Sequence, residues 1–499
     1  MRNGNLMFRF IVPIVLAIAM YCVVLRVEEQ EQSPEPQPLK PRYRPFLNSF
    51  LLMIWMLMFL PVILFTGKDY EGTLHALISM WFTVSFHIGI YYLLLTAVLP
   101  LLRRWISARV CAALWLLPNY LYLIVSNSSY APSRPLLVLN LPVGFVQVIL
   151  GIWLMGFIAI FVWKIVEHLR FRKQLLQTAV PVTDPEILAV WETEQQAAGY
   201  KNRRYPLLIS SAAKTPLTIG FTGSSMRVIL PEKSYFKEEL SLILRHELIH
   251  WGRNDASTKL FLTFCTALCW INPFTWYAMR RSTDDLELSC DESVLLDADE
   301  ASRRRYAELL LTTAADDRGF TSNLSNSAKA LRYRLLQVMR PREKAAGAMV
   351  LAVIFYLLFV TCGYAAIPYA KTSGADAFFH SRKQSECMLN AVQLYGEKVP
   401  EQTYVPVSHF QCKDEEGLHA YLSGLQLSKL AGEFEYAQGK EHTLTFVYEI
   451  SDGHVFIHFY DDLIGVQSLF HGKMTAYGYI SDEKIDQEIL MSYMTRANE

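Results

Sequence analysis

His246 and His250 stand four residues apart in the stretch His246-Glu247-Leu248-Ile249-His250, and this spacing can build a metal site. On an α-helix, positions i and i+4 lie on one face, one turn apart, so both imidazoles can hold a single metal ion. Neutral imidazoles suit zinc, and a catalytic zinc takes three protein donors and leaves a fourth position open for water. Glu247 would then be the general base, facing that water rather than the metal.

The residues around the motif predict the helix that it needs. Apolar side chains surround the histidines at Leu240, Leu242, Ile243, Leu244, Leu248 and Ile249. Ser234 could cap this helix, with Glu238 and Glu239 in its first turns. The alternative is a chance pattern on a half-buried helix, because a motif match remains a hypothesis until its context agrees.

A third metal donor is expected downstream, in the acidic stretch 284–292. Glu287 would complete a site of two histidines and one glutamate. Asp291, one helical turn later, could accept the free ring N–H of a ligand histidine and so fix its tautomer. Two alternatives stay open: a solvated acidic helix face, or metal binding by Cys265, Cys269 and Cys290, which the absence of a Cys-x-x-Cys pair disfavours.

Several blocks in this region, in their order and spacing, resemble the BlaR/MecR-type membrane zinc metallopeptidases, whose best-studied members are beta-lactam-sensing antirepressors. The blocks cover about the middle third of the chain and comprise Thr215–Leu217, Gly220–Phe221, Val228–Pro231, Arg245–His250 with Arg253 and Asp255, Trp270–Phe274, Glu287–Leu295, Tyr306–Leu310 and Leu331–Leu335. The resemblance implies a zinc metalloendopeptidase of gluzincin-like type. It makes His246, His250 and Glu287 the zinc ligands and Glu247 the catalytic acid/base.

Composition indicates a membrane protein. The 499 residues are 52% hydrophobic and 19% charged, with a formal net charge of zero, so the chain has no basic surplus for binding nucleic acid directly. The apolar residues come in blocks near the ~20 residues needed to cross a bilayer. The predicted spans are 6–25, 47–66, 78–102, 109–126, 142–166 and 346–366. A retained helix is preferred to a signal peptide for the first, and a Pro- and Glu-rich linker occupies 26–46.

Lysine and arginine near the span ends predict the orientation. Clusters at 40–44, 103–109, 164–173 and 332–344 all fall on the cytoplasmic side if the amino terminus is outside. The zinc motif then lies in the cytoplasm, and residues 367–499 lie outside. The sequence thus predicts a multi-pass protein of a bacterial-type plasma membrane.

The apolar block 259–279 is long enough to cross, but crossing would separate Glu287 from His246. Metal donors must converge within ~2 Å of one ion, so this block is predicted to be a buried or membrane-grazing helix that breaks at Asn272-Pro273 and returns. Residues 206–231 alternate like a strand pair beside the zinc helix. Its exposed edge could hold a peptide substrate by strand addition, or the pair could be a plain scaffold hairpin.

The external segment 367–499 is predicted to be a small α+β domain that senses a signal. A hairpin is expected around Ser451-Asp452-Gly453, with helices near 414–431 and 482–496. Cys387 and Cys412 lie where a disulfide could persist. This segment departs from the best-known relatives, because its only Ser-x-x-Lys, Ser481 to Lys484, has no following Lys-Thr-Gly. The penicillin-binding sensor module of those relatives is therefore not expected in this segment.

The expected fold is a polytopic α-helical membrane protein with a cytoplasmic, α-rich (α+β) zincin-like metallopeptidase lobe and a small extracytoplasmic α+β domain. Its domains are expected at 1–166, 167–345, 346–366 and 367–499. The preferred function is a regulatory zinc endopeptidase that turns an external signal into cleavage of a cytoplasmic transcriptional repressor or of itself. The alternatives are a housekeeping membrane protease, or a non-catalytic receptor with a structural zinc.

Overall fold

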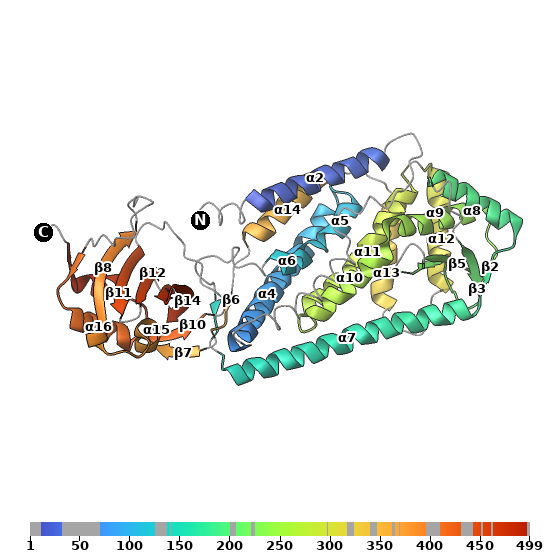
Figure 1. The fold of residues 1–499 in the computed structure, drawn as a ribbon. Helices are drawn as coiled ribbons and strands as arrows, with labels where there is room; N and C mark the ends of the chain where they lie inside the picture. The colour runs from blue at the N-terminus through green and yellow to red at the C-terminus, as the bar shows by residue number, and fades with distance from the viewer. Residues whose placement is uncertain are drawn as a thin grey trace.

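The computed structural model describes residues 11–31, 70–124, 137–139, 141–199, 206–220, 225–296, 298–316, 324–339, 347–361, 365–368, 370–395, 410–430, 443–450, 453–460 and 463–496. Helix α7 (Val143–Gln177) runs along most of the molecule (Figure 1). A small mixed sheet lies at its carboxyl end, and a larger antiparallel sheet lies beyond its amino end. The predicted span 47–66 and most of the predicted linker lie outside the described residues.

An apolar helical bundle lies between the two sheets. It contains α2 (Val12–Glu31), α4 (Tyr70–Leu102), α5 (Ala108–Leu114), η2 (Leu117–Tyr120), α6 (Leu121–Ile124) and α14 (Ala348–Val360). Among the described residues, α4 and α7 are long and apolar enough to cross a membrane. The apolar stretches of α2 and α14 are shorter, 13–26 and 348–360, and these two helices pack against each other. Helices α4 and α7, by their length and apolar composition, indicate association with a membrane.

Two predicted spans differ from the structure. The segment 109–126 is not one helix, because α5 ends at Leu114 and Pro118 opens a short 3-10 turn before α6. The span expected at 346–366 contains the 13-residue helix α14, which at 1.5 Å per residue is only about 20 Å long. After α14 the chain forms strand β6 (Ala365–Ala366), which pairs with β1 (Leu137–Val138) just before α7.

The apolar block 259–279 breaks where its sequence predicts. Four residues separate the end of helix α10 (Asp255–Leu268) from the start of α11 (Pro273–Val294). The Asn272 side chain accepts a hydrogen bond from the Phe274 amide and so caps α11. Pro273 occupies the first turn of α11, where its missing N–H costs nothing. Phe264 of α10 packs edge-on against Phe157 and Phe161 of α7, at ring distances of 5.6 and 5.5 Å. The pair α10–α11 is therefore part of the apolar bundle.

The lobe at the carboxyl end of α7 combines a four-stranded sheet with helices. The sheet order is β2-β3-β5-β4, from strands β2 (Ala179–Pro181), β3 (Leu207–Ser210), β4 (Leu217–Ile219) and β5 (Arg227–Pro231). The helices are α8 (Pro185–Ala197), α9 (Lys237–Arg253), α12 (Glu300–Asp316) and α13 (Leu324–Met339). Residues 206–231 do not form a plain hairpin, because β3 and β5 are parallel neighbours and β4 is antiparallel to β5 at the sheet edge.

The C-terminal lobe is built on a seven-stranded sheet of order β7-β10-β14-β13-β12-β11-β8. Its strands are β7 (Ala370–Ser373), β8 (Cys387–Tyr395), β10 (Gln426–Lys429), β11 (Thr443–Ile450), β12 (Gly453–Tyr460), β13 (Leu463–Phe470) and β14 (Lys473–Ser481). Helices α15 (Gly374–Phe379) and α16 (Glu415–Gly424) contribute Phe378, Phe379 and Leu418 to its apolar core. Around it lie η4 (Gln384–Glu386), β9 (Phe410–Cys412), α17 (Gln487–Ser492) and β15 (Met494–Arg496).

Sequence predictions for this lobe have mixed outcomes. The hairpin is confirmed, since β11 and β12 pair in the register Ile450 with Gly453. The helix expected over 414–431 ends at Gly424, because the chain continues as β10 inside the sheet. The helix expected over 482–496 is limited to α17, and 494–496 form β15. Cys387 and Cys412 are free thiols.

Candidate metal centre

Helix α9 carries the two histidines on one face. Eight of its residues are buried, and they hold the helix against the small sheet and the helices of its lobe. Its first turn differs from the prediction: Phe236 rather than Ser234 precedes the helix, and the Phe236 amide donates to the Glu239 carboxylate at 3.2 Å. Because the histidines are one turn apart, their rings meet edge to face with centroids 4.7 Å apart.

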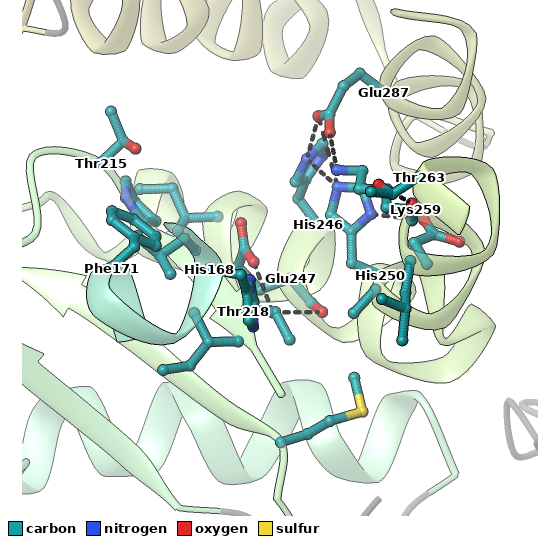
Figure 2. A pocket seen from close by; sticks show the side chains of 18 of the residues that line it. His168, Phe171, Thr215, Thr218, His246, Glu247, His250, Lys259, Thr263 and Glu287 are labelled. Carbon is teal, nitrogen blue, oxygen red and sulfur yellow. Dashed lines mark hydrogen bonds and ion pairs between the residues drawn. The ribbon is translucent and has the colours of Figure 1, made fainter. Parts of the chain in front are cut away.

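Three donor atoms converge in front of this face. The Nε2 atoms of His246 and His250 lie 3.1 Å apart, and Oε2 of Glu287 on α11 lies 3.6 and 3.5 Å from them. Donors bound tetrahedrally at roughly 2.0–2.1 Å from one zinc ion lie about 3.3 Å apart. The spacing and chemistry of these three groups therefore fit a single zinc ion, and Figure 2 shows the three side chains gathered together.

Glu287 is held as a carboxylate by its surroundings. Lys259 Nζ lies 3.2 Å from its Oε1, and Arg334 Nη1 lies 3.8 Å from its Oε2. Burial acts to raise the pKa of Glu287, but the two histidines and Lys259 outweigh burial and hold the pKa well below its usual value. A deprotonated side chain is the form that binds a metal.

Each histidine has a partner on its second ring nitrogen. His250 Nδ1 lies 2.7 Å from Oδ2 of Asp255, and this carboxylate is 7% exposed. His246 Nδ1 lies 2.9 Å from the hydroxyl of Tyr306. When each Nδ1–H donates to its partner, both Nε2 atoms keep a lone pair for a metal.

The prediction that Asp291 accepts directly from a ligand histidine is corrected by the structure. Asp291 Oδ1 is 3.7 Å from His246 Nδ1, and the Tyr306 hydroxyl stands between them, donating to that oxygen at 2.7 Å. Arg334 donates two hydrogen bonds to the same carboxylate, from Nε to Oδ2 at 2.6 Å and from Nη2 to Oδ1 at 2.7 Å. Asp291 therefore positions Tyr306, and Tyr306 positions His246. The sequence pattern gave neither Tyr306 nor Asp255 this role, although both fall in the blocks that carry the family resemblance.

Of the three cysteines weighed as ligands, Cys290 lies at the site. Its sulfur and one nitrogen of each histidine all lie within 4.8 Å of one another, and the thiol is fully buried. Burial raises the pKa of this thiol, but the histidines lower it to about 7. Cys265 and Cys269 lie in the apolar bundle instead, where Cys269 contacts Ser85 and Tyr122.

Glu247 faces a cavity beside the three donors. The cavity has a volume of about 850 Å³ and is lined by α7, β4, α9, α10 and the donors themselves. The Thr218 hydroxyl of β4 donates a hydrogen bond to Oε2 of Glu247 at 2.7 Å. Glu247 is buried, with 6% of the residue exposed. Figure 2 shows Thr218 and Glu247 facing the cavity, with His246, His250 and Glu287 gathered on its other side.

Helix α11 is fixed to the bundle two residues before Glu287. Asp285 is 1% exposed and accepts hydrogen bonds from Arg103 at 2.6 Å and from the Trp115 indole at 2.7 Å. Glu292 on the same helix accepts from the Ala108 amide at the start of α5, at 2.8 Å. These hydrogen bonds fix the part of α11 that carries Glu287 to the ends of helices α4 and α5.

Two comparisons with known proteins find similar sequences in this region. Residues 142–338 match the family described as BlaR1 peptidase M56. The chain is also 26% identical over 216 residues to the regulatory protein BlaR1 of Bacillus licheniformis, which covers 41% of this chain and 35% of that protein. The match thus spans about a third of the length of this relative. The residues that match the family model include His246, His250 and Glu287.

Proposed function

We propose that this chain, whose residues 142–338 match the family described as BlaR1 peptidase M56, is a membrane-embedded zinc metalloendopeptidase with a regulatory role. It turns a signal outside the cell into cleavage of a cytoplasmic repressor or of itself. The observation that carries the proposal is the convergence of three donor atoms, 3.1 to 3.6 Å apart, on a cavity that also holds a carboxylate not needed as a donor.

His246, His250 and Glu287 hold the zinc in this proposal. Glu287 is preferred to Cys290 as the third donor, because its oxygen matches the tetrahedral spacing to both histidine nitrogens. When bound, the metal supplies Lewis-acid polarisation of the scissile carbonyl and of a water molecule. A site with three protein donors beside a carboxylate suits catalysis better than a structural zinc, which four donors would normally close.

Glu247 is the general base. Its carboxylate takes a proton from the attacking water and passes it to the leaving amine. The hydrogen bond from Thr218 keeps the carboxylate turned toward the cavity, so the proton acceptor is in place before a substrate arrives. The Tyr306–Asp291–Arg334 chain and Asp255 hold the histidine rings in the orientation that this chemistry needs.

Strand β4 is the proposed binding edge for the substrate backbone. It pairs only with β5 among the described residues, and residues 215–219 line the cavity. An extended peptide can add to such an edge by main-chain hydrogen bonds, which bind many sequences with similar affinity. The scissile bond then lies next to Glu247, because Thr218 of this strand contacts Glu247 directly.

The domain arrangement follows the helix directions. Helices α4 and α7 start near the C-terminal lobe and end near the metal centre, so a bilayer around them separates the two lobes (Figure 1). In this proposal the metallopeptidase lobe, within 167–345, is cytoplasmic, and the lobe within 367–499 is the external sensor. The charged cluster after residue 163 supports this orientation. The bonds from Asp285 to Arg103 and Trp115 give bundle movements a route to Glu287.

Glu247→Gln is the decisive test. The variant should keep about one zinc per chain, because it removes no donor, and cleavage should fall by roughly 10²–10⁴-fold. Newly formed peptide ends are compared by mass spectrometry in cells that express the wild-type or variant chain. Glu238→Gln, an exposed position on the same helix, is the matched control. Equal sets of cleaved ends in wild-type and Glu247→Gln cells would reject the proposed function.

A further inference from the structure

The cavity lies at the level where helix α7 leaves its apolar span. No charged residue occurs from Val143 to Trp163, and the first is Lys164. Large apolar side chains on this stretch are exposed, among them Phe145, Val148, Ile152, Met155, Ile158, Val162 and Trp163. From Phe145 to Trp163 the helix rises about 27 Å, close to the ~30 Å of a bilayer's hydrocarbon core.

Trp163 and Lys164 mark the boundary itself. The Lys164 ammonium lies 4.5 Å from the centre of the Trp163 ring, and the indole is 57% exposed. Tryptophan is enriched at the membrane–water interface, and lysine at the end of an apolar span extends its charge toward water. The hydrocarbon core therefore ends near Lys164.

The cavity begins at this same residue. Lys164, His168 and Phe171 of α7 line one wall of the cavity. On α10, Leu260 and Thr263 line it, while the next residue, Phe264, packs against Phe157 and Phe161 inside the apolar bundle. The two helices are thus in contact within the bundle, and the cavity opens where they part. Lys164 to Phe171 spans about 10 Å along α7.

From this placement we infer that the substrate is a membrane-anchored polypeptide, cut in the extended segment that follows its own membrane span. This inference rests on the proposed function and narrows it, because the chain itself is anchored in the membrane and a repressor would need its own membrane anchor. An extended chain covers roughly 3.3 Å per residue, so about three residues reach from the bilayer boundary to the far end of the cavity. Cleavage sites therefore fall within roughly the first three residues beyond the substrate's span, largely independent of sequence, because β4 binds the backbone. A freely soluble substrate must bring an unfolded segment to the bilayer surface and is cut more slowly.

The test uses the full chain in vesicles of phosphatidylcholine and phosphatidylglycerol. The probe is a single-span test protein followed by a flexible segment of mixed sequence, and the same segment without the span is the soluble counterpart. Mass spectrometry maps the cuts. We expect cuts clustered within roughly three residues of the span. The soluble segment should be cleaved at least about tenfold more slowly. Cuts scattered along the segment, or equal rates for both probes, would overturn the inference while leaving the protease intact.

A variant of α7 tests separately whether the distance from the bilayer boundary to the cavity sets the cleavage position. Lys164→Leu lengthens the uncharged run to Val166, about 4.5 Å more helix, which draws the cavity toward the bilayer. The cuts should then move one to two residues closer to the span, whereas Lys173→Leu, further along α7 and outside the cavity lining, should leave them in place. An unchanged cut position in Lys164→Leu contradicts the inference. Absence of cleavage of both probes by the wild-type chain would instead reject the proposed function together with it.

Discussion

Asp255 gives the sharpest test of how the metal centre is supported. Its carboxylate lies 2.7 Å from His250 Nδ1, and the two side chains are only 7% and 11% exposed, so water cannot readily replace the bond. Removing a carboxylate that orients a ligand histidine typically weakens metal binding 10- to 100-fold. Asp255→Asn keeps an acceptor oxygen but loses the charge, so we expect about tenfold weaker zinc binding, or ~1.4 kcal/mol. Asp255→Ala loses both, and we expect about 100-fold.

The assay is a zinc competition with a chromophoric chelator on purified full-length chain near neutral pH, with circular dichroism as a check of the fold. Asp284→Asn is the matched control, because this carboxylate lies on α11 but pairs at the surface with Arg281, and both side chains are more than a third exposed. Zinc affinity in the control should equal that of the wild type. Wild-type affinity in a folded Asp255→Ala variant would show that His250 needs no such partner, and the reasoning would be wrong.

Three further changes test the surrounding structure. Asn254 joins α9 to α10 with a positive φ of 55°, so Asn254→Ala should destabilise the lobe by roughly 1–2 kcal/mol and Asn254→Gly by much less, as measured by thermal unfolding. Asp285→Ala leaves Arg103 without its carboxylate in the bundle and should cost about 3–5 kcal/mol, seen as a lower denaturation midpoint in detergent. Burial lowers the pKa of His458 in the C-terminal lobe to about 3, from 6.5. Since the unfolded chain takes up this proton first, stability present above pH 6.5 is lost as the pH falls, by about 2 kcal/mol near pH 5, and His458→Gln should flatten that dependence.

Each of these has a contrary outcome. Equal stability of the alanine and glycine variants at Asn254 would mean that the positive φ carries no strain. A small effect at Asp285 would mean that Arg103 finds another partner. An unchanged slope of stability against pH in His458→Gln would assign the acid sensitivity of the lobe to other groups.

The sequence by itself determined the local parts of the site. The helical repeat alone puts His246 and His250 on one face, and Glu247 directly follows His246 in the sequence. The Asn272-Pro273 pair predicts the break before α11, because proline cannot continue a helix but can begin one. The order of the blocks indicated the family. Glu287 was named as the third donor from the acidic stretch and the family resemblance, and the break was then required to bring Glu287 to the histidines.

Only the tertiary structure decided which distant segments contact one another. Asp255 reaches His250 because Asn254 bends the backbone between two helices, whereas an uninterrupted helix would turn Asp255 to another face. Tyr306 stands between His246 and Asp291, and Thr218 of β4 holds Glu247, because the packing of α12 and the small sheet against α9 places them there. Asp285 pairs with Arg103 across 182 positions of sequence. Residue types and local periodicity predict which side chains share a helix face, but partners on different elements depend on how those elements pack.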